Sequence, residues 1–188
     1  MRRIFKRHIQ GKKVLTIFML TNLVYLFMIF ITIPKVMQYA SGMDLFDMMP
    51  AGYRVEYAQS LLNTLGPDGR RAYMYSQLPV DMIYPLLFGL TYSLMLAYFL
   101  NKLMWFDKPV FFIVLLPLVA GLFDYAENIG IFSMLQAYPD FSVSTAAWTN
   151  SFTIIKSALS TVSFVILLTL LAFFLVRRMS PHKPEANS

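Results

Sequence analysis

The sequence contains no cysteine, and its only two histidines lie in polar stretches near the two ends. The absence of cysteine excludes disulfide bonds, thiolate catalysis, Cys-based zinc sites and iron–sulfur clusters. Because His8 and His182 lie outside the apolar segments, a histidine metal site or a Ser–His triad within those segments is excluded as well. No nucleophile motif, metal-ligand set or phosphate-binding loop is present, and we expect no cofactor.

Charged residues are also scarce, at 14% of the 188 residues, while 57% are hydrophobic. Soluble domains carry roughly 25% charged residues, and one soluble core of this size could not bury so much apolar surface. Lipid must therefore cover part of it. The net charge is +6, and basic residues crowd the first thirteen positions: Arg2, Arg3, Lys6, Arg7, Lys12 and Lys13. Because this run adjoins an apolar segment, it indicates membrane topology and contact with membrane lipid, and no nucleic-acid partner is expected.

Four apolar segments are long enough to cross a membrane, which takes about 20 residues. They cover about 14–36, 80–104, 110–135 and 148–176. The apolar part of the first exceeds the 7–15 residues usual in a signal peptide, so a retained span is favoured. We predict an all-α integral membrane protein, a four-transmembrane-helix bundle. Its membrane domain covers 14–178, between a basic tail at 1–13 and a disordered tail at 179–188.

Lysine and arginine next to the spans predict the orientation of the bundle. The N-terminal tail has six such residues, the C-terminal tail has three, and Lys102 and Lys108 enclose the short turn, whereas the third connection has none. The first connection has four, but four acidic residues accompany them. The positive-inside rule places both tails and this turn in the cytoplasm. The absence of a cleavable signal and the short connections favour a bacterial inner (plasma) membrane.

The long first connection contains a predicted short helical hairpin on the extracytoplasmic side, over about 53–78. Apolar residues recur at helical spacing up to Leu65, Gly66 is placed to end that helix, and Pro67 suits the first turn of another. The second helix would carry Arg70 and Arg71. Amphipathic packing at the membrane interface explains the hairpin more simply than a lid over a binding site.

Polar residues within each span recur on one face, which predicts four helices with their polar sides turned inward. In the third and fourth spans these include Asp124, Glu127 and Lys156. A charge at such depth costs at least ~2.5–3.5 kcal/mol without a partner, and one lysine cannot pair fully with both acids. Asp81 adds a third acid at a similar depth. Either a carboxyl is protonated, or another cation enters, from the hairpin arginines or from a ligand.

These residues predict a polar, acid-rich pocket in the outer half of the bundle that binds a small amphiphile or a lipid. Its acids would hold a polar or cationic head or transfer a proton, so enzyme activity rests on the acid pair alone. The candidate residues are Asp81, Tyr84, Tyr92, Asp124, Glu127, Asn128, Thr153 and Lys156. Two alternatives stay open. The chain is a structural or accessory subunit whose charges only fix helix packing, or it is a proton- or ion-coupled transporter, which would need a homo-oligomer.

Overall fold

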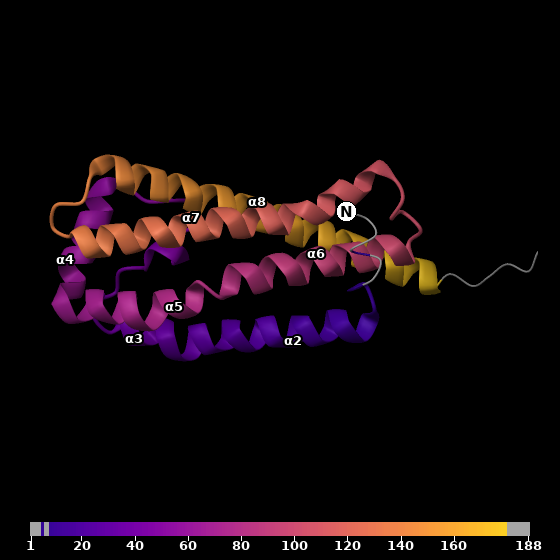
Figure 1. Cartoon of the computed structure of the whole chain (residues 1–188), viewed down its shortest axis with the longest axis horizontal. Helices are drawn as coiled ribbons and strands as arrows, with labels where there is room; N and C mark the ends of the chain where they lie inside the picture. Colours follow the sequence, from indigo (N-terminus) through magenta and orange to yellow (C-terminus); the bar gives the residue numbers. More distant parts are fainter. Residues whose placement is uncertain (1–4, 6–7, 180–188) are drawn as a thin grey trace, which may run out of the picture.

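A computed structural model describes residue 5 and residues 8–179, so part of the predicted basic tail and nearly all of the predicted disordered tail lie outside the described residues. The regular structure of the described part is entirely helical, and no strand is present among these residues. Its helices form an elongated bundle in which long segments lie side by side (Figure 1). Four stretches are long and apolar enough to cross a membrane: Gly11–Met37, Val55–Lys102, Pro109–Ala137 and Val143–Met179.

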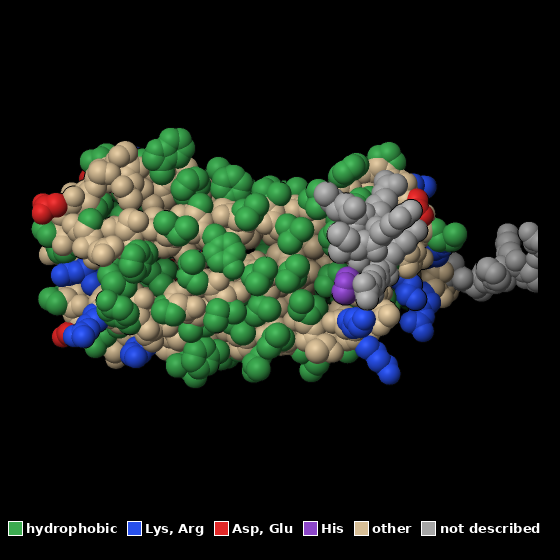
Figure 2. Space-filling view, viewed as in Figure 1, with side chains coloured by type: hydrophobic (Ala, Val, Ile, Leu, Met, Phe, Trp, Pro, Cys, Tyr) green, Lys and Arg blue, Asp and Glu red, His purple; other side chains and the backbone are tan. Residues whose placement is uncertain are grey.

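The outer surface of the bundle is apolar along most of its length. Met19, Leu23 and Phe30 on the first stretch are 64%, 65% and 72% exposed. Hydrophobic side chains cover the middle of the molecule, while charged side chains gather at its two ends (Figure 2). Monomeric soluble proteins rarely expose so continuous an apolar surface. The surface and the helix lengths together indicate a multi-pass membrane protein.

The first stretch consists of α2, Gly11–Phe27, a short π-helical segment, Met28–Thr32, and α3, Ile33–Met37. The chain then forms an irregular segment over 38–54 that includes a single 3₁₀ turn, Phe46–Met48. Helix α4, Val55–Ala72, follows and lies across one end of the bundle (Figure 1). We call this end the α4 end. The opposite end, where Gly11 and Met179 lie, is the tail end.

Helix α4 changes direction where the sequence pattern indicated. Gly66 has φ 61°, in the left-handed region that glycine adopts without a steric penalty, and Pro67 begins the second half. This half continues through a π-helical segment, Tyr73–Gln77, into α5, Leu78–Asp81. Only a two-residue turn separates α5 from α6, Tyr84–Lys102. The second half of the hairpin therefore runs almost directly into the second span.

The third span begins with a 3₁₀ segment, Pro109–Leu115, followed by α7, Leu116–Ala137. Pro117 therefore lies in the first turn of α7, where its missing amide is tolerated, and it does not bend the middle of an α-helix. Helix α8, Val143–Met179, begins earlier than the apolar run. The Ser142 hydroxyl accepts a hydrogen bond from the Thr145 amide at 3.0 Å, which caps this start.

Helix α7 packs against both α6 and α8, and α2 packs against α6. Glycine permits close approach at two of these contacts. A Cβ on Gly121 would lie 2.7 Å from the carbonyl oxygen of Pro85 on α6, and one on Gly130 would overlap Thr149 on α8. These contacts hold the polar faces of α6, α7 and α8 close together. The acidic side chains are positioned there.

Candidate functional site

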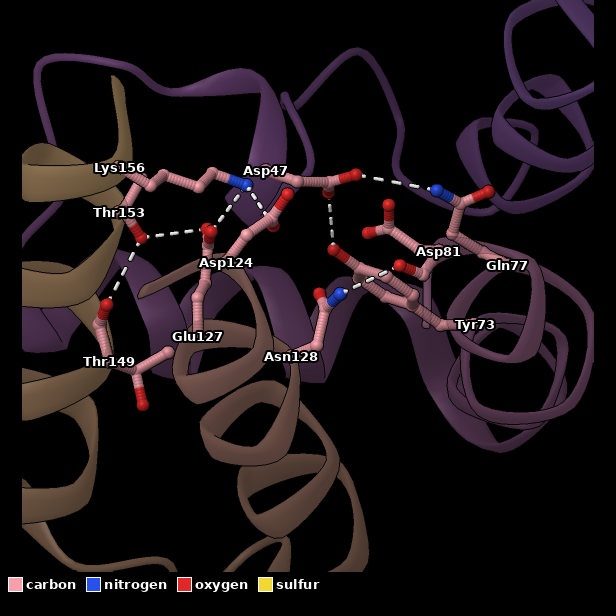
Figure 3. A network of polar contacts seen from close by, with 10 residues as sticks. All are labelled: Asp47, Tyr73, Gln77, Asp81, Asp124, Glu127, Asn128, Thr149, Thr153 and Lys156. Atoms are coloured by element: carbon pink, nitrogen blue, oxygen red, sulfur yellow. Dashed lines mark hydrogen bonds and ion pairs between the residues drawn. The ribbon is translucent and has the colours of Figure 1, made fainter. Parts of the chain in front are cut away.

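An ion-paired group links α7 to α8. The Lys156 ammonium lies 2.9 Å from Asp124 Oδ1 and also contacts Glu127 Oε2 (Figure 3). Thr153, one turn earlier on α8, donates to Glu127 Oε1 at 2.8 Å. The three-residue step between the two acids places both on the side of α7 that faces α8. Two carboxylates therefore share one ammonium, as their spacing suggested.

This group lies inside the protein. The Glu127 and Thr153 side chains are fully buried, and Asp124 is 9% exposed. The Lys156 side chain retains 14% exposure. Glu127 Oε2 has the ion-pair contact with Lys156 but no hydrogen-bond partner. In such surroundings a carboxylate that lacks its cation is far more costly than one on the surface.

Asp81, at the end of α5, adds a further acid beside Asn128 of α7. Pro85 has no amide to donate to the Asp81 carbonyl four residues earlier. The Asn128 side-chain amide donates to that carbonyl instead, at 3.2 Å. Within the described part of the chain, the Asp81 carboxyl oxygen Oδ2 and the Asn128 amide oxygen Oδ1 have no hydrogen-bond partner, although the two residues are 3% and 1% exposed. Two acceptors are thus buried without a donor.

Asp47 completes the acidic group and was not among the residues predicted from the sequence. It lies on the 3₁₀ turn of the irregular segment and points toward the group from the loop side (Figure 3). Its Oδ1 accepts from the Tyr73 hydroxyl at 2.7 Å, and its Oδ2 accepts from Gln77 at 3.4 Å. Gln77 in turn accepts a short hydrogen bond from Thr32. The irregular segment 38–54, which lies between two spans, thus contributes a carboxylate to the interior of the bundle.

We call Asp47, Asp81, Asp124, Glu127 and Lys156 the acid cluster. Asp47, Asp124 and Glu127 each lie close enough to Asp81 to interact with it electrostatically, as does Lys156. The cluster therefore combines four carboxyl groups with one ammonium. It thus has more carboxyl groups than ammonium groups, and buried oxygens of Asp81 and Asn128 have no donor among the described residues.

Tyr53 closes the cluster on the side of the irregular segment. Its backbone amide donates to Asn150 of α8 at 2.6 Å, next to Gly52, whose φ is 86°. Burial, reinforced by the nearby Glu127 carboxylate, raises the pKa of the Tyr53 hydroxyl. The tyrosine is therefore a neutral group beside Glu127 at physiological pH.

The two hairpin arginines lie elsewhere. Arg70 donates to the Leu62 carbonyl at 2.7 Å, and its guanidinium lies 4.1 Å from the centre of the Tyr138 ring. Arg71 is exposed at the α4 end. The ion pairs among the described residues leave both arginines out of the cluster. Neither arginine is therefore the additional cation that the sequence analysis gave as one of its alternatives, which leaves a protonated carboxyl or a ligand.

Tyr84 and Tyr92 belong to a strip of aromatic rings along α6. Tyr84 stacks on Tyr25 of α2, with 5.6 Å between ring centroids. Tyr92 meets Phe164 of α8 edge to face, at 4.7 Å. Phe88 lies between Tyr84 and Tyr92 and contacts both rings. The strip is closest to the cluster at Tyr84, which interacts electrostatically with Asp124 and Asp81. These five rings, Tyr25, Tyr84, Phe88, Tyr92 and Phe164, form the aromatic strip.

The chemistry available to the cluster is that of carboxylates, one ammonium and hydroxyls. The described residues contain no group of three histidine, cysteine or acidic side chains that could hold a metal ion. The acceptors can hold an organic cation or a proton donor, and paired carboxyls can exchange protons. No protein-family model, curated protein or solved structure matches the chain. Its function must therefore be argued from the cluster itself.

Proposed function

We propose that the protein binds a small membrane amphiphile with a cationic head. The head lies among the carboxyls of the acid cluster, and the apolar part lies along the aromatic strip. The observation that supports this most directly is the surplus of buried acceptors. Four carboxyls and the unpaired oxygens of Asp81 and Asn128 surround a single ammonium. A ligand ammonium supplies the missing charge and up to three donors.

The aromatic strip supports an amphiphile over a soluble cation. Tyr25 and Phe164 are 43% and 39% exposed on the apolar surface, whereas Phe88 is 6% exposed. The strip thus extends from the lipid-facing surface inward, and it is nearest to the cluster at Tyr84. Aromatic rings supply apolar contact area and attract a cation to their faces. A ligand that enters from the membrane would meet the rings before the carboxyls.

The orientation we propose places the tail end in the cytoplasm and the α4 end, with the cluster, in the outer half. Lys12, Lys102 and Lys108 at the tail end support it. The α4 end also carries basic residues, but Asp44 and Asp68 accompany them. A bacterial inner membrane is the setting we propose.

Binding of two matched probes in a mild detergent, measured by native mass spectrometry, tests the function. Dodecylamine carries an ammonium, and dodecanol has the same chain with a neutral head. We expect the amine to bind more tightly to the wild-type chain. The Asp81→Asn variant should bind the amine about tenfold more weakly, because it loses one charge-assisted contact, and should bind the alcohol unchanged.

Glu56→Gln is the matched control, because Glu56 is an exposed acid at the same end of the bundle. It should bind both probes as the wild type does. Equal binding of the amine and the alcohol by the wild type would overturn the proposal. The cluster would then be neutralised by protons, and the structural alternative would gain support.

A further inference from the structure

A second charged feature lies at the α4 end, separate from the acid cluster. A cavity of about 510 Å³ opens between the end of the first span and the second half of α4. Its polar lining combines two cations, one carboxylate and three hydroxyls: Lys35, Tyr39, Asp68, Arg71, Tyr75 and Ser76. Charged side chains of both signs gather at this end of the molecule (Figure 2, left). A cavity of this size is in the range of small-molecule sites.

The charges around the cavity are available to a ligand. Both ion pairs recorded among the described residues belong to Lys156, so Lys35, Asp68 and Arg71 have none there. The Lys35 and Arg71 side chains are exposed. Arginine and lysine together are well suited to a phosphate group, since both donate charge-assisted hydrogen bonds to its oxygens.

The two walls of the cavity are held together by a tight contact. A Cβ on Gly69 would lie 2.6 Å from Tyr39 Cβ, so only glycine lets α4 pack this closely on the segment after α3. Arg71 follows two residues after Gly69, and Lys35 precedes Tyr39 by four. The contact therefore holds the backbone segments that carry the two cations close together.

The cavity lies beside the end of the first apolar span. Lys35 lies in the last turn of α3, where the first apolar span ends. The preceding turns expose apolar side chains, with Phe30 at 72% and Ile31 at 53%. Lysine at the end of a span is positioned at the membrane interface, while the exposed apolar turns face the acyl chains.

We propose that this cavity binds the headgroup of a zwitterionic aminophospholipid. Lys35 and Arg71 hold its phosphate, Asp68 holds its ammonium, and its acyl chains lie along Phe30 and Ile31. The carboxylate of Asp68 distinguishes this headgroup from a purely anionic one, which it would repel. This site is independent of the acid cluster and of the ligand proposed there.

Native mass spectrometry with phosphatidylethanolamine and phosphatidylglycerol of matched acyl chains tests the assignment. We expect the wild type to bind phosphatidylethanolamine more tightly. The double variant Lys35→Gln/Arg71→Gln should bind this lipid at least about tenfold more weakly, because both contacts to the phosphate lose their charge. Asp68→Asn should shift the preference toward phosphatidylglycerol, a change that simple loss of folding would not produce.

Arg54→Gln is the matched control, because Arg54 is an exposed arginine at the same end that does not line this cavity. Its lipid binding should equal that of the wild type, and all variants should keep the wild-type melting temperature. Binding within twofold of wild type in the double variant would overturn the proposal. Displacement of the lipid by an equal concentration of glycerophosphoethanolamine would overturn the assignment to a lipid and indicate a soluble phosphate ester.

Discussion

Replacing Lys156 by methionine tests whether the acid cluster depends on its single ammonium. Methionine keeps the length and apolar stem of lysine and removes the charge. Asp124, 2.9 Å from the ammonium, and Glu127, which also contacts it, would then be buried without a cation. We expect Lys156→Met to be one of the most destabilising single changes in α8.

The size of this effect follows from the geometry. At an effective dielectric constant of about 20, unit charges 2.9 Å apart attract by roughly 6 kcal/mol, part of which offsets the cost of burying them. Removing one partner of a buried ion pair costs about 3–5 kcal/mol in measured cases. For a chain of this length, each kcal/mol corresponds to about 2–4 °C in melting temperature. The expected loss is therefore about 6–20 °C.

Thermal unfolding in detergent, followed by tryptophan fluorescence, measures this loss. The triple variant Lys156→Met/Asp124→Asn/Glu127→Gln should recover most of it, because it leaves no unpaired charge. It should nevertheless lose binding of dodecylamine, whereas a purely structural cluster predicts no ligand to lose. A loss below about 2 °C for Lys156→Met alone would refute the reasoning, since that is the range of an exposed pair.

Two further changes test the packing and the orientation. Gly121→Ala should destabilise the protein by about 1–3 kcal/mol, because its Cβ would lie 2.7 Å from the Pro85 carbonyl oxygen. Gly11→Ala is the control, because its Cβ would lie at an ordinary contact distance of 3.5 Å from the Tyr98 hydroxyl oxygen. It should be neutral or stabilising in the same unfolding assay. Because the chain has no cysteine, single cysteines report topology cleanly. In intact cells an impermeant maleimide should label Tyr75→Cys and spare Lys102→Cys, and the reverse pattern would contradict the proposed orientation.

The membrane-spanning helices could be predicted from the sequence because the lipid bilayer restricts both the length and the backbone structure of a span. Every span needs about 20 apolar residues, and its backbone must bond within itself. The bend of α4 could also be predicted, because Gly66 adopts a left-handed conformation easily and Pro67 suits the first turn of a helix. The near-continuous course of the chain from α4 through α5 into α6 could not be predicted. Pro85 has no amide to donate to the Asp81 carbonyl, and Asn128 of α7 supplies the donor instead. Such compensation depends on tertiary contacts.

The residues of α7 and α8 in the cluster followed from helical spacing, since Asp124, Glu127 and Lys156 were bound to meet if the polar faces turned inward. Asp47 could not be found in this way, because it lies in an irregular segment with no periodicity. A weak signal existed. Leu45 and Phe46 precede it and are fully buried, so this segment enters the bundle and does not lie on its surface. Apolar residues within a polar connection indicated that entry.

The composition of the cluster supports the ligand that we propose over a purely structural role. One carboxyl on α7 and Lys156 on α8 would suffice to fix the register of the two helices. Asp81 adds a third buried carboxyl within a span, where an unpaired charge costs about 2.5–3.5 kcal/mol. Asp47 adds a half-buried fourth carboxyl from outside the spans. The Asp81 oxygen without a partner gains nothing from the helix packing in return. In the function that we propose, a cationic ligand supplies the missing partner of this oxygen. The aromatic strip, which begins at the lipid-facing surface, is the route by which we propose that it enters.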